Sequence, residues 1–227
     1  MTVLDRTPVL TAGTTAGTTA AAPSTDRLAP VLLAAGVVVA PIALGVAFRV
    51  DQVGLPRIDP AEYVAGIEAH RGGYLAGTLL YGLGTALSIV NGLAVRRVLG
   101  GRLGLLMAVL GGITGVLAGC VTGMRTVLLG AVGPDGATPG TVEVFTAWQE
   151  SPWFGVMVPM LLSAVLSTLL LVGSVLVTGW LPRWVAAAVL VGTVLSSGEF
   201  GTAVTAAGGV LLTVAALPLA RAVLATR

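Results

Sequence analysis

The sequence predicts an all-α membrane protein: a polytopic bundle of six transmembrane helices, with two short amphipathic helices in the loops on one side. Of its 227 residues, 56% are hydrophobic and only 10% are charged, whereas an ordinary soluble domain has about 25% charged residues. The mean hydropathy is +0.98. These values exclude a soluble globular fold, and the apolar residues gather in runs close to the roughly 20 residues that one membrane crossing needs.

Residues 1–27 are rich in Thr, Ala and Gly, and the sequence AGTT occurs twice in succession from Ala12 to Thr19. This composition is typical of a disordered tail. Because no basic segment precedes an apolar core of signal-peptide length, we expect no cleavage of the tail. Residues 28–227 then form one six-helix transmembrane domain.

Six apolar runs follow the tail, and each predicts a membrane-spanning helix. They are 28–48, 73–95, 103–122, 154–178, 184–197 and 201–219. The fifth run has about the length of a buried or re-entrant segment. Its length alone does not decide whether the fifth helix spans the membrane fully.

The loop before the second run predicts a short amphipathic helix that lies in the membrane interface. Asp59 suits its N-cap, Pro60 its first turn and Glu62 the capping-box position. Provided that Gly72 and Gly73 do not break the helix, one face is formed by Tyr63, Ile67, His70 and Tyr74.

The loop before the fourth run predicts a second amphipathic helix, starting at Thr138-Pro139. Its two expected faces carry Val144, Phe145 and Trp148 on one side and Glu143, Thr146 and Glu150 on the other.

Charge divides the connections into two sides. The N-terminal tail, the 2–3 and 4–5 connections and the C-terminal tail hold eight arginines and two acids, a net charge of +6. The remaining segments hold four arginines and eight acids, a net charge of −4. Because basic residues mark cytoplasmic loops, we expect a multi-pass protein of the cell membrane with both termini in the cytoplasm and both amphipathic helices outside.

Small residues recur at four-residue spacing in two helices, which lets helix backbones approach closely in lipid. In the second run they are Gly73, Gly77, Gly84, Ser88 and Gly92, and in the third Gly104, Ala108, Gly111, Gly115, Gly119 and Gly123. We therefore expect these two helices at the bundle centre. The same stripes would permit a homo-oligomer.

Composition also excludes several kinds of site. With one histidine, His70, the chain cannot supply two haem ligands or a multi-histidine metal cluster, and with one cysteine, Cys120, it forms no internal disulfide. The arginines form no cluster that predicts nucleic-acid binding. We predict no metal and no cofactor.

Glu199 is the first candidate for chemistry, because it lies in a minimal hairpin between two apolar runs. Burial there would raise its pKa toward the range of proton transfer, although it also fits a solvated acid at the outer turn. His70 with Glu62 and Glu68 is an alternative acid–base group. The plainer interpretation is that Glu62 caps a helix and Glu68 faces solvent.

Arg125 follows the apolar core of the third run. It fits an arginine that snorkels to the interface; if the helix continues outward, it would be embedded and need Glu150 or Glu199 as a partner. Asn91, inside the second run, is expected to bond a neighbouring helix.

Aromatic residues and acids gather on the outer side, which predicts an outer-half pocket for a small hydrophobic or isoprenoid-like molecule. The expected lining residues are Tyr63, Tyr74, Tyr81, Arg125, Trp148, Glu150, Trp153 and Phe200. Membrane lipids are the other expected partners.

The chain has long outer loops before the second and fourth helices, and the stretch Trp180-Leu181-Pro182-Arg183-Trp184 opens the fifth helix. This layout resembles that of uncharacterised bacterial multi-pass proteins classed as domains of unknown function. That resemblance brings no catalytic residues. In size and in the placing of its outer acids the chain is also similar to small membrane-bound terpene cyclases. This second resemblance implies Glu62 or Glu68 and Glu199 as acids, although the chain lacks an Asp-rich run.

Two alternatives to simple binding follow. An enzyme of terpene-cyclase type would use Glu199 or Glu68 to protonate an alkene or epoxide and His70 as base, with aromatic faces stabilising positive charge. A small transporter subunit is the other alternative, but the runs lack a central charged residue of the kind that midplane transport sites use.

Overall fold

The computed structural model describes residues 28–51, 53, 59–133, 135–196 and 202–226. Every regular element in this part of the chain is helical. In order they are α1 (Leu28–Val50), α2 (Pro60–Ala69), α3 (Arg71–Leu99), α4 (Gly101–Ala131), α5 (Pro139–Gln149), the short 3-10 helix η2 (Pro152–Val156), α6 (Met157–Thr178), α7 (Arg183–Leu195) and α8 (Thr202–Ala225).

The predicted helical membrane bundle is confirmed, but six full-length spans are not. Five helices among the described residues are long and apolar enough to cross a membrane, namely α1, α3, α4, α6 and α8. The fifth predicted span is α7, an apolar helix of only 13 residues, which is shorter than the roughly 20 residues of a typical crossing.

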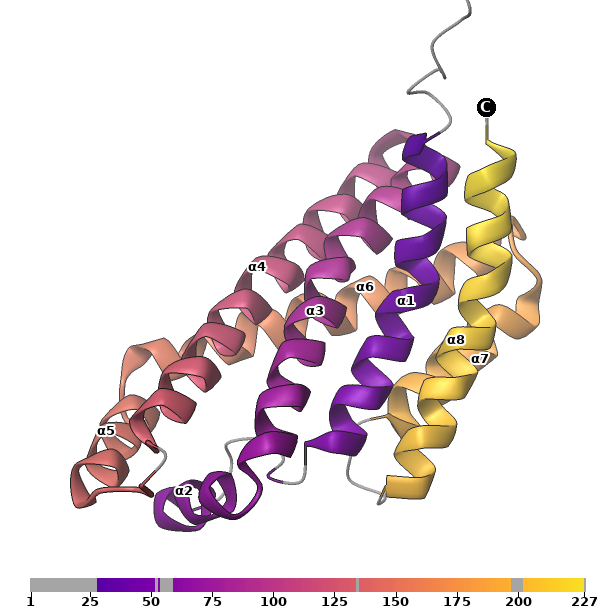
Figure 1. The fold of residues 1–227 in the computed structure, drawn as a ribbon. Coiled ribbons are helices and arrows are strands. Elements are labelled where there is room, and N and C mark those ends of the chain that lie inside the picture. Colours follow the sequence, from indigo (N-terminus) through magenta and orange to yellow (C-terminus); the bar gives the residue numbers. More distant parts are fainter. Residues whose placement is uncertain (1–27, 52, 54–58, 134, 197–201, 227) are drawn as a thin grey trace, which may run out of the picture.

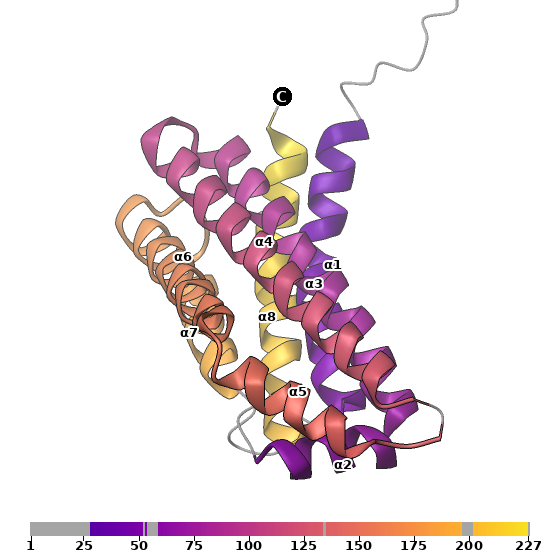
Figure 2. The same cartoon turned by 90° about the vertical axis from the view of Figure 1, so that its left-hand side faces the viewer.

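The bundle has two distinct ends (Figure 1). Helices α2 and α5, which we call the roof helices, lie across one end, and Figure 2 shows them side by side there. Leu28 and the C-terminal residues lie at the opposite end, the termini end. The six remaining α-helices run between the roof end and the termini end in alternating directions.

These six helices form a closed ring. Each packs against the next in the order α1, α3, α4, α6, α7, α8 and back to α1. Helices α3 and α8 also meet at the termini end, where Arg97 Nη2 donates a hydrogen bond of 3.1 Å to the carbonyl oxygen of Thr226. Helices α3 and α4 are neighbours in this ring and pack closely on one another.

Glycines hold α3 and α4 close together. A Cβ atom on Gly111 would lie 2.6 Å from the carbonyl oxygen of Ser88, and one on Gly92 would lie 2.8 Å from that of Met107. The predicted stripe is only partly used, since Cβ atoms on Gly119 and Gly123 would meet nothing within 4 Å. The stripe on α4 thus marks the α3–α4 contact from Gly104 to Gly115.

The roof helices begin at the N-caps that the sequence predicts, Asp59 and Thr138. The carboxylate of Asp59 accepts hydrogen bonds from the backbone N–H groups of Ala61 at 2.8 Å and Glu62 at 3.2 Å, with Pro60 in the first turn. Thr138 and Thr141 form a capping box at the start of α5. The helix breaks at His70, where φ is −125° and ψ is 34°, so His70 is exposed rather than on the buried face.

Candidate functional site

A buried ion pair lies beneath the roof helices. Arg125 on α4 is paired through Nη2 with the carboxylate of Asp51, just beyond the end of α1, and the two side chains are only 5% and 9% exposed. Arg125 Nε donates a hydrogen bond of 3.0 Å to Thr78 Oγ1. Its guanidinium carbon also lies 4.4 Å from the centre of the Tyr74 ring. The pair therefore joins α1, α3 and α4.

Aromatic rings fill the space between this pair and the roof. The Tyr63 hydroxyl donates to that of Tyr74 at 3.3 Å, and the Tyr63 ring stacks on Phe145 with centroids 4.8 Å apart. Phe145 in turn stacks on Trp148 at 5.4 Å. Burial raises the pKa of Tyr63, against an opposing effect of the Arg125 charge. These rings contact one another and fix the roof on the bundle.

The snorkelling interpretation of Arg125 is wrong. Helix α4 continues to Ala131, well beyond the predicted run, and carries Arg125 into the buried cluster. Its acidic partner is Asp51 rather than Glu150, which is exposed. Sequence reasoning missed Asp51. The only local signal was its position directly after an apolar helix.

The other predicted site residues are dispersed. Glu62, Glu68 and His70 are exposed at the roof end, and no three Asp, Glu, His or Cys residues in the described part of the chain are grouped as metal ligands. Tyr81 is half-buried, with its ring centre 6.3 Å from that of Phe48.

Three further predictions concern Glu199, Phe200 and the side chain of Trp153. Glu199 and Phe200 lie outside the described residues, and the side chain of Trp153 is likewise not described. Their predicted roles stay predictions.

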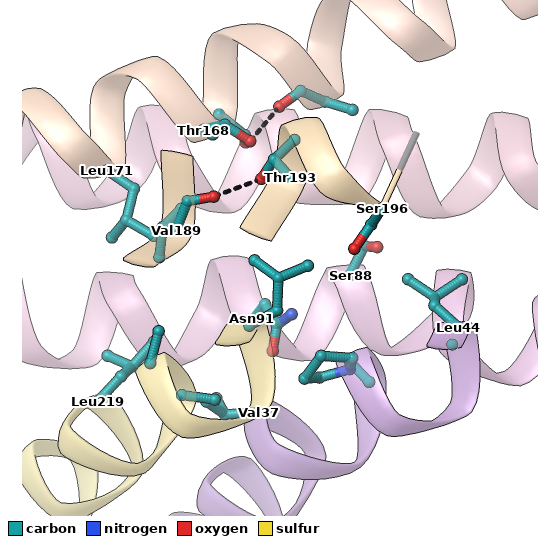
Figure 3. A pocket seen from close by; sticks show the side chains of 18 of the residues that line it. Val37, Leu44, Ser88, Asn91, Thr168, Leu171, Val189, Thr193, Ser196 and Leu219 are labelled. Atoms are coloured by element: carbon teal, nitrogen blue, oxygen red, sulfur yellow. Dashed lines mark hydrogen bonds between the residues drawn. The ribbon is translucent and has the colours of Figure 1, made fainter. Parts of the chain in front are cut away.

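A cavity of about 310 Å³ lies inside the helix ring (Figure 3). All six ring helices line it, and none of the described lining residues is charged. Its hydroxyl- and amide-bearing residues are Ser88, Asn91, Thr114, Ser167, Thr168, Thr193, Ser196 and Thr205. The remaining lining residues are aliphatic, aromatic, glycine, proline or methionine, so the cavity is mostly apolar.

The polar lining groups differ in their hydrogen bonds. Thr168 Oγ1 donates to the carbonyl of Ala164 at 3.0 Å and Thr193 Oγ1 to that of Val189 at 2.7 Å, so both are satisfied within their own helices. By contrast, Asn91 Oδ1 and Ser196 Oγ are buried and have no protein partner among the described residues. Within that part of the chain, the predicted hydrogen bond between Asn91 Oδ1 and a neighbouring helix is therefore absent.

Pro41 leaves one backbone carbonyl of α1 without its helical donor, and α1 lines the cavity. Pro41 lies inside α1 and lines the cavity together with Val37, four residues earlier. Because proline has no N–H group, the Val37 carbonyl lacks its usual helical donor. In a membrane such a carbonyl is tolerated where it is buried in protein or lines a cavity.

Comparison with known proteins adds no relative. No family model, no curated protein and no solved structure matches this chain. Its function must therefore follow from the geometry of its own residues.

Proposed function

We propose that this integral membrane protein binds a small, uncharged, mostly apolar molecule in the cavity at the centre of its helix ring. The observation that carries the proposal is the cavity itself: about 310 Å³, contributed by all six ring helices and free of charged groups among its described lining residues. This volume lies at the lower end of the roughly 300–1,000 Å³ of small-molecule sites, which are mostly apolar with a few polar groups.

The site proposed here lies deeper than the outer-half pocket that the sequence predicts. Tyr63, Tyr74 and Phe145 are each 0% exposed. Their rings are in contact with one another or with Trp148, so they occupy the space beneath the roof. A hydrophobic or isoprenoid-like ligand remains the proposed class, but its contacts are with the ring helices.

The geometry favours binding over an acid-initiated reaction. A cyclase-type enzyme needs an acid that reaches the bound alkene. The described lining residues include no acid, since Glu62 and Glu68 are exposed at the roof end, and Glu199 lies outside the described residues. The geometry also favours a protein that binds the molecule over a transporter that passes it across the membrane. Tightly packed Val175, Val185 and Val223, at most 1% exposed, belong to the apolar core toward the termini end.

Naphthalene tests the proposal, because it is neutral, apolar, fluorescent and small. The protein is reconstituted in nanodiscs, and naphthalene binding is measured by fluorescence lifetime against empty nanodiscs of the same lipid. We expect saturable binding to the wild type. Ala164→Phe fills the cavity from α6 and should weaken binding at least tenfold.

Val165→Phe is the matched control, because Val165 is on the same helix but 52% exposed and outside the cavity lining. It should bind naphthalene as the wild type does. Naphthalene uptake no greater than that of empty nanodiscs, or equal loss in both variants, would overturn the proposal.

A further inference from the structure

Asn91 is the strongest polar feature of the cavity. It lies within α3, a candidate membrane span, and lines the cavity with its carboxamide oxygen buried and unpartnered among the described residues. Polar side chains inside a membrane are expensive and usually face an interior cavity where they serve function. A molecule bound in the cavity can therefore supply the hydrogen-bonding partner of this amide.

The protein does satisfy other polar groups that line the cavity. The hydroxyls of Thr114, Thr168 and Thr193 each donate to a carbonyl four residues earlier in the same helix. An asparagine amide cannot be satisfied so simply, because it carries two donors and an acceptor with two lone pairs. Asn91 therefore differs from these threonines, because its amide oxygen has no hydrogen-bonding partner among the described residues.

Asn91 has lining residues of the cavity on either side of it along the bundle. Figure 3 shows Leu171, Val189 and Leu219 to one side of the amide, and Ser88 and Ser196 together with Leu44 to the other. The aliphatic side belongs to the core toward the termini end. Ser196, whose hydroxyl is also unpartnered among the described residues, follows the last turn of α7 toward the roof end. Apolar groups thus lie on both sides of the amide, and the hydroxyls of Ser88 and Ser196 lie on one side.

We propose, on the basis of the proposed function, that the ligand is an uncharged amphipathic molecule with a hydroxyl or carboxamide group. That group hydrogen-bonds the amide of Asn91, and the apolar body of the ligand lies against Leu171 and Leu219. Either group can donate to the amide oxygen or accept from the amide nitrogen. An ionised group is excluded, because no described lining residue carries a compensating charge.

Three probes of one shape test this assignment: naphthalene, 2-naphthol and 2-naphthoate, each measured in nanodiscs against empty nanodiscs at neutral pH. In the wild type, 2-naphthol should bind about five- to tenfold more tightly than naphthalene, as expected for one additional hydrogen bond. The anion 2-naphthoate should show no saturable binding.

Asn91→Leu keeps the size of the side chain and removes its amide. It should abolish the preference, so that this variant binds 2-naphthol and naphthalene with equal affinity. Thr213→Val is the matched control, since Thr213 lies in α8, donates to the Gly209 carbonyl at 2.8 Å and is absent from the cavity lining. It should retain the preference for 2-naphthol.

The outcomes separate the two proposals. Naphthalene binding without a preference for 2-naphthol in the wild type overturns the assignment to Asn91 and leaves the proposed function standing. Retention of the preference in Asn91→Leu overturns the assignment in the same way. If none of the probes binds the wild type, the proposed function fails and this inference fails with it. If Asn91→Leu does not fold, the ratio of 2-naphthol affinity to naphthalene affinity in the wild type still tests the assignment to Asn91.

Discussion

Arg125 and Asp51 form an ion pair that is almost completely removed from solvent, although 74 residues separate them in the chain. The pair fastens the end of α1 to the roof-side half of α4. Thr78 and the face of the Tyr74 ring also contact the Arg125 side chain. Because a buried charge without its partner is far more costly than the intact pair, this contact makes a sharp prediction.

Replacing Asp51 by Ala should destabilise the protein by about 3–5 kcal/mol, the usual cost of removing one partner of a buried pair. Reversible chemical unfolding of the reconstituted protein measures this. Asp135→Ala is the control, because Asp135 is exposed, and it should change stability by less than about 0.5 kcal/mol.

Adding Arg125→Met to Asp51→Ala should recover part of the lost stability, since the double variant buries no uncompensated charge. The effect of Arg125→Met on stability is also measured in the wild type. If Arg125→Met lowers stability by the same amount in the Asp51→Ala background, the two side chains act independently.

Two adjacent glycines of α4 should respond oppositely to the same substitution. A Cβ on Gly111 would lie 2.6 Å from the Ser88 carbonyl oxygen, whereas one on Gly112 would meet nothing within 4 Å. Gly111→Ala forces α3 and α4 apart and should cost about 1–3 kcal/mol. Gly112→Ala should be neutral or stabilise by up to about 1 kcal/mol through helix propensity. Equal unfolding free energies for the two variants would contradict the close α3–α4 contact.

Features set by neighbouring residues could be predicted from sequence. The caps at Asp59 and Thr138 depend on residues within one helical turn, and each is present. The apolar runs likewise locate the membrane helices. They place the end of α4 too early, because Arg125 interrupts the apolar pattern. In the folded chain Asp51 compensates that charge, so the helix continues to Ala131.

The cavity could not be predicted, because a hydroxyl inside an apolar run looks the same whether or not its own helix satisfies it. Thr168 bonds the carbonyl of Ala164, while Ser196 Oγ has no partner among the described residues. The difference depends on helix contacts between distant segments. Asn91 is recognisable in the sequence as a polar group, but its position in a cavity wall follows only from the closed ring.

Ionisation of Tyr63 should destabilise the protein at high pH. Burial raises the pKa of this roof-helix phenol above its usual value of 10.0. The unfolded chain therefore loses the Tyr63 proton first, so stability is full below about pH 10 and falls as pH rises toward the folded pKa. Unfolding free energies measured from about pH 8 to pH 11 should fall less steeply in Tyr63→Phe.

Phe145→Leu is the control for this titration. It disturbs the same stack, in which Phe145 lies 4.8 Å from Tyr63, but removes no titratable group. Its baseline stability should be lower and its pH slope unchanged. An identical slope in Tyr63→Phe and the wild type would show that Tyr63 does not contribute.

The division of arginines predicts which end of the bundle faces the cytoplasm. The termini end carries Arg96, Arg102, Arg183 and Arg221, all exposed, whereas the roof end carries exposed acids such as Glu62 and Glu68. Since basic loops are retained inside, we expect the roof outside.

The exposed native thiol is first removed by Cys120→Ala, and then Glu68→Cys and Arg102→Cys are introduced separately. A membrane-impermeant maleimide added to intact cells should label Glu68→Cys, and it should label Arg102→Cys only after the membrane is permeabilised. The reverse pattern would place the termini outside and refute the orientation, while leaving the helix ring and its cavity unchanged.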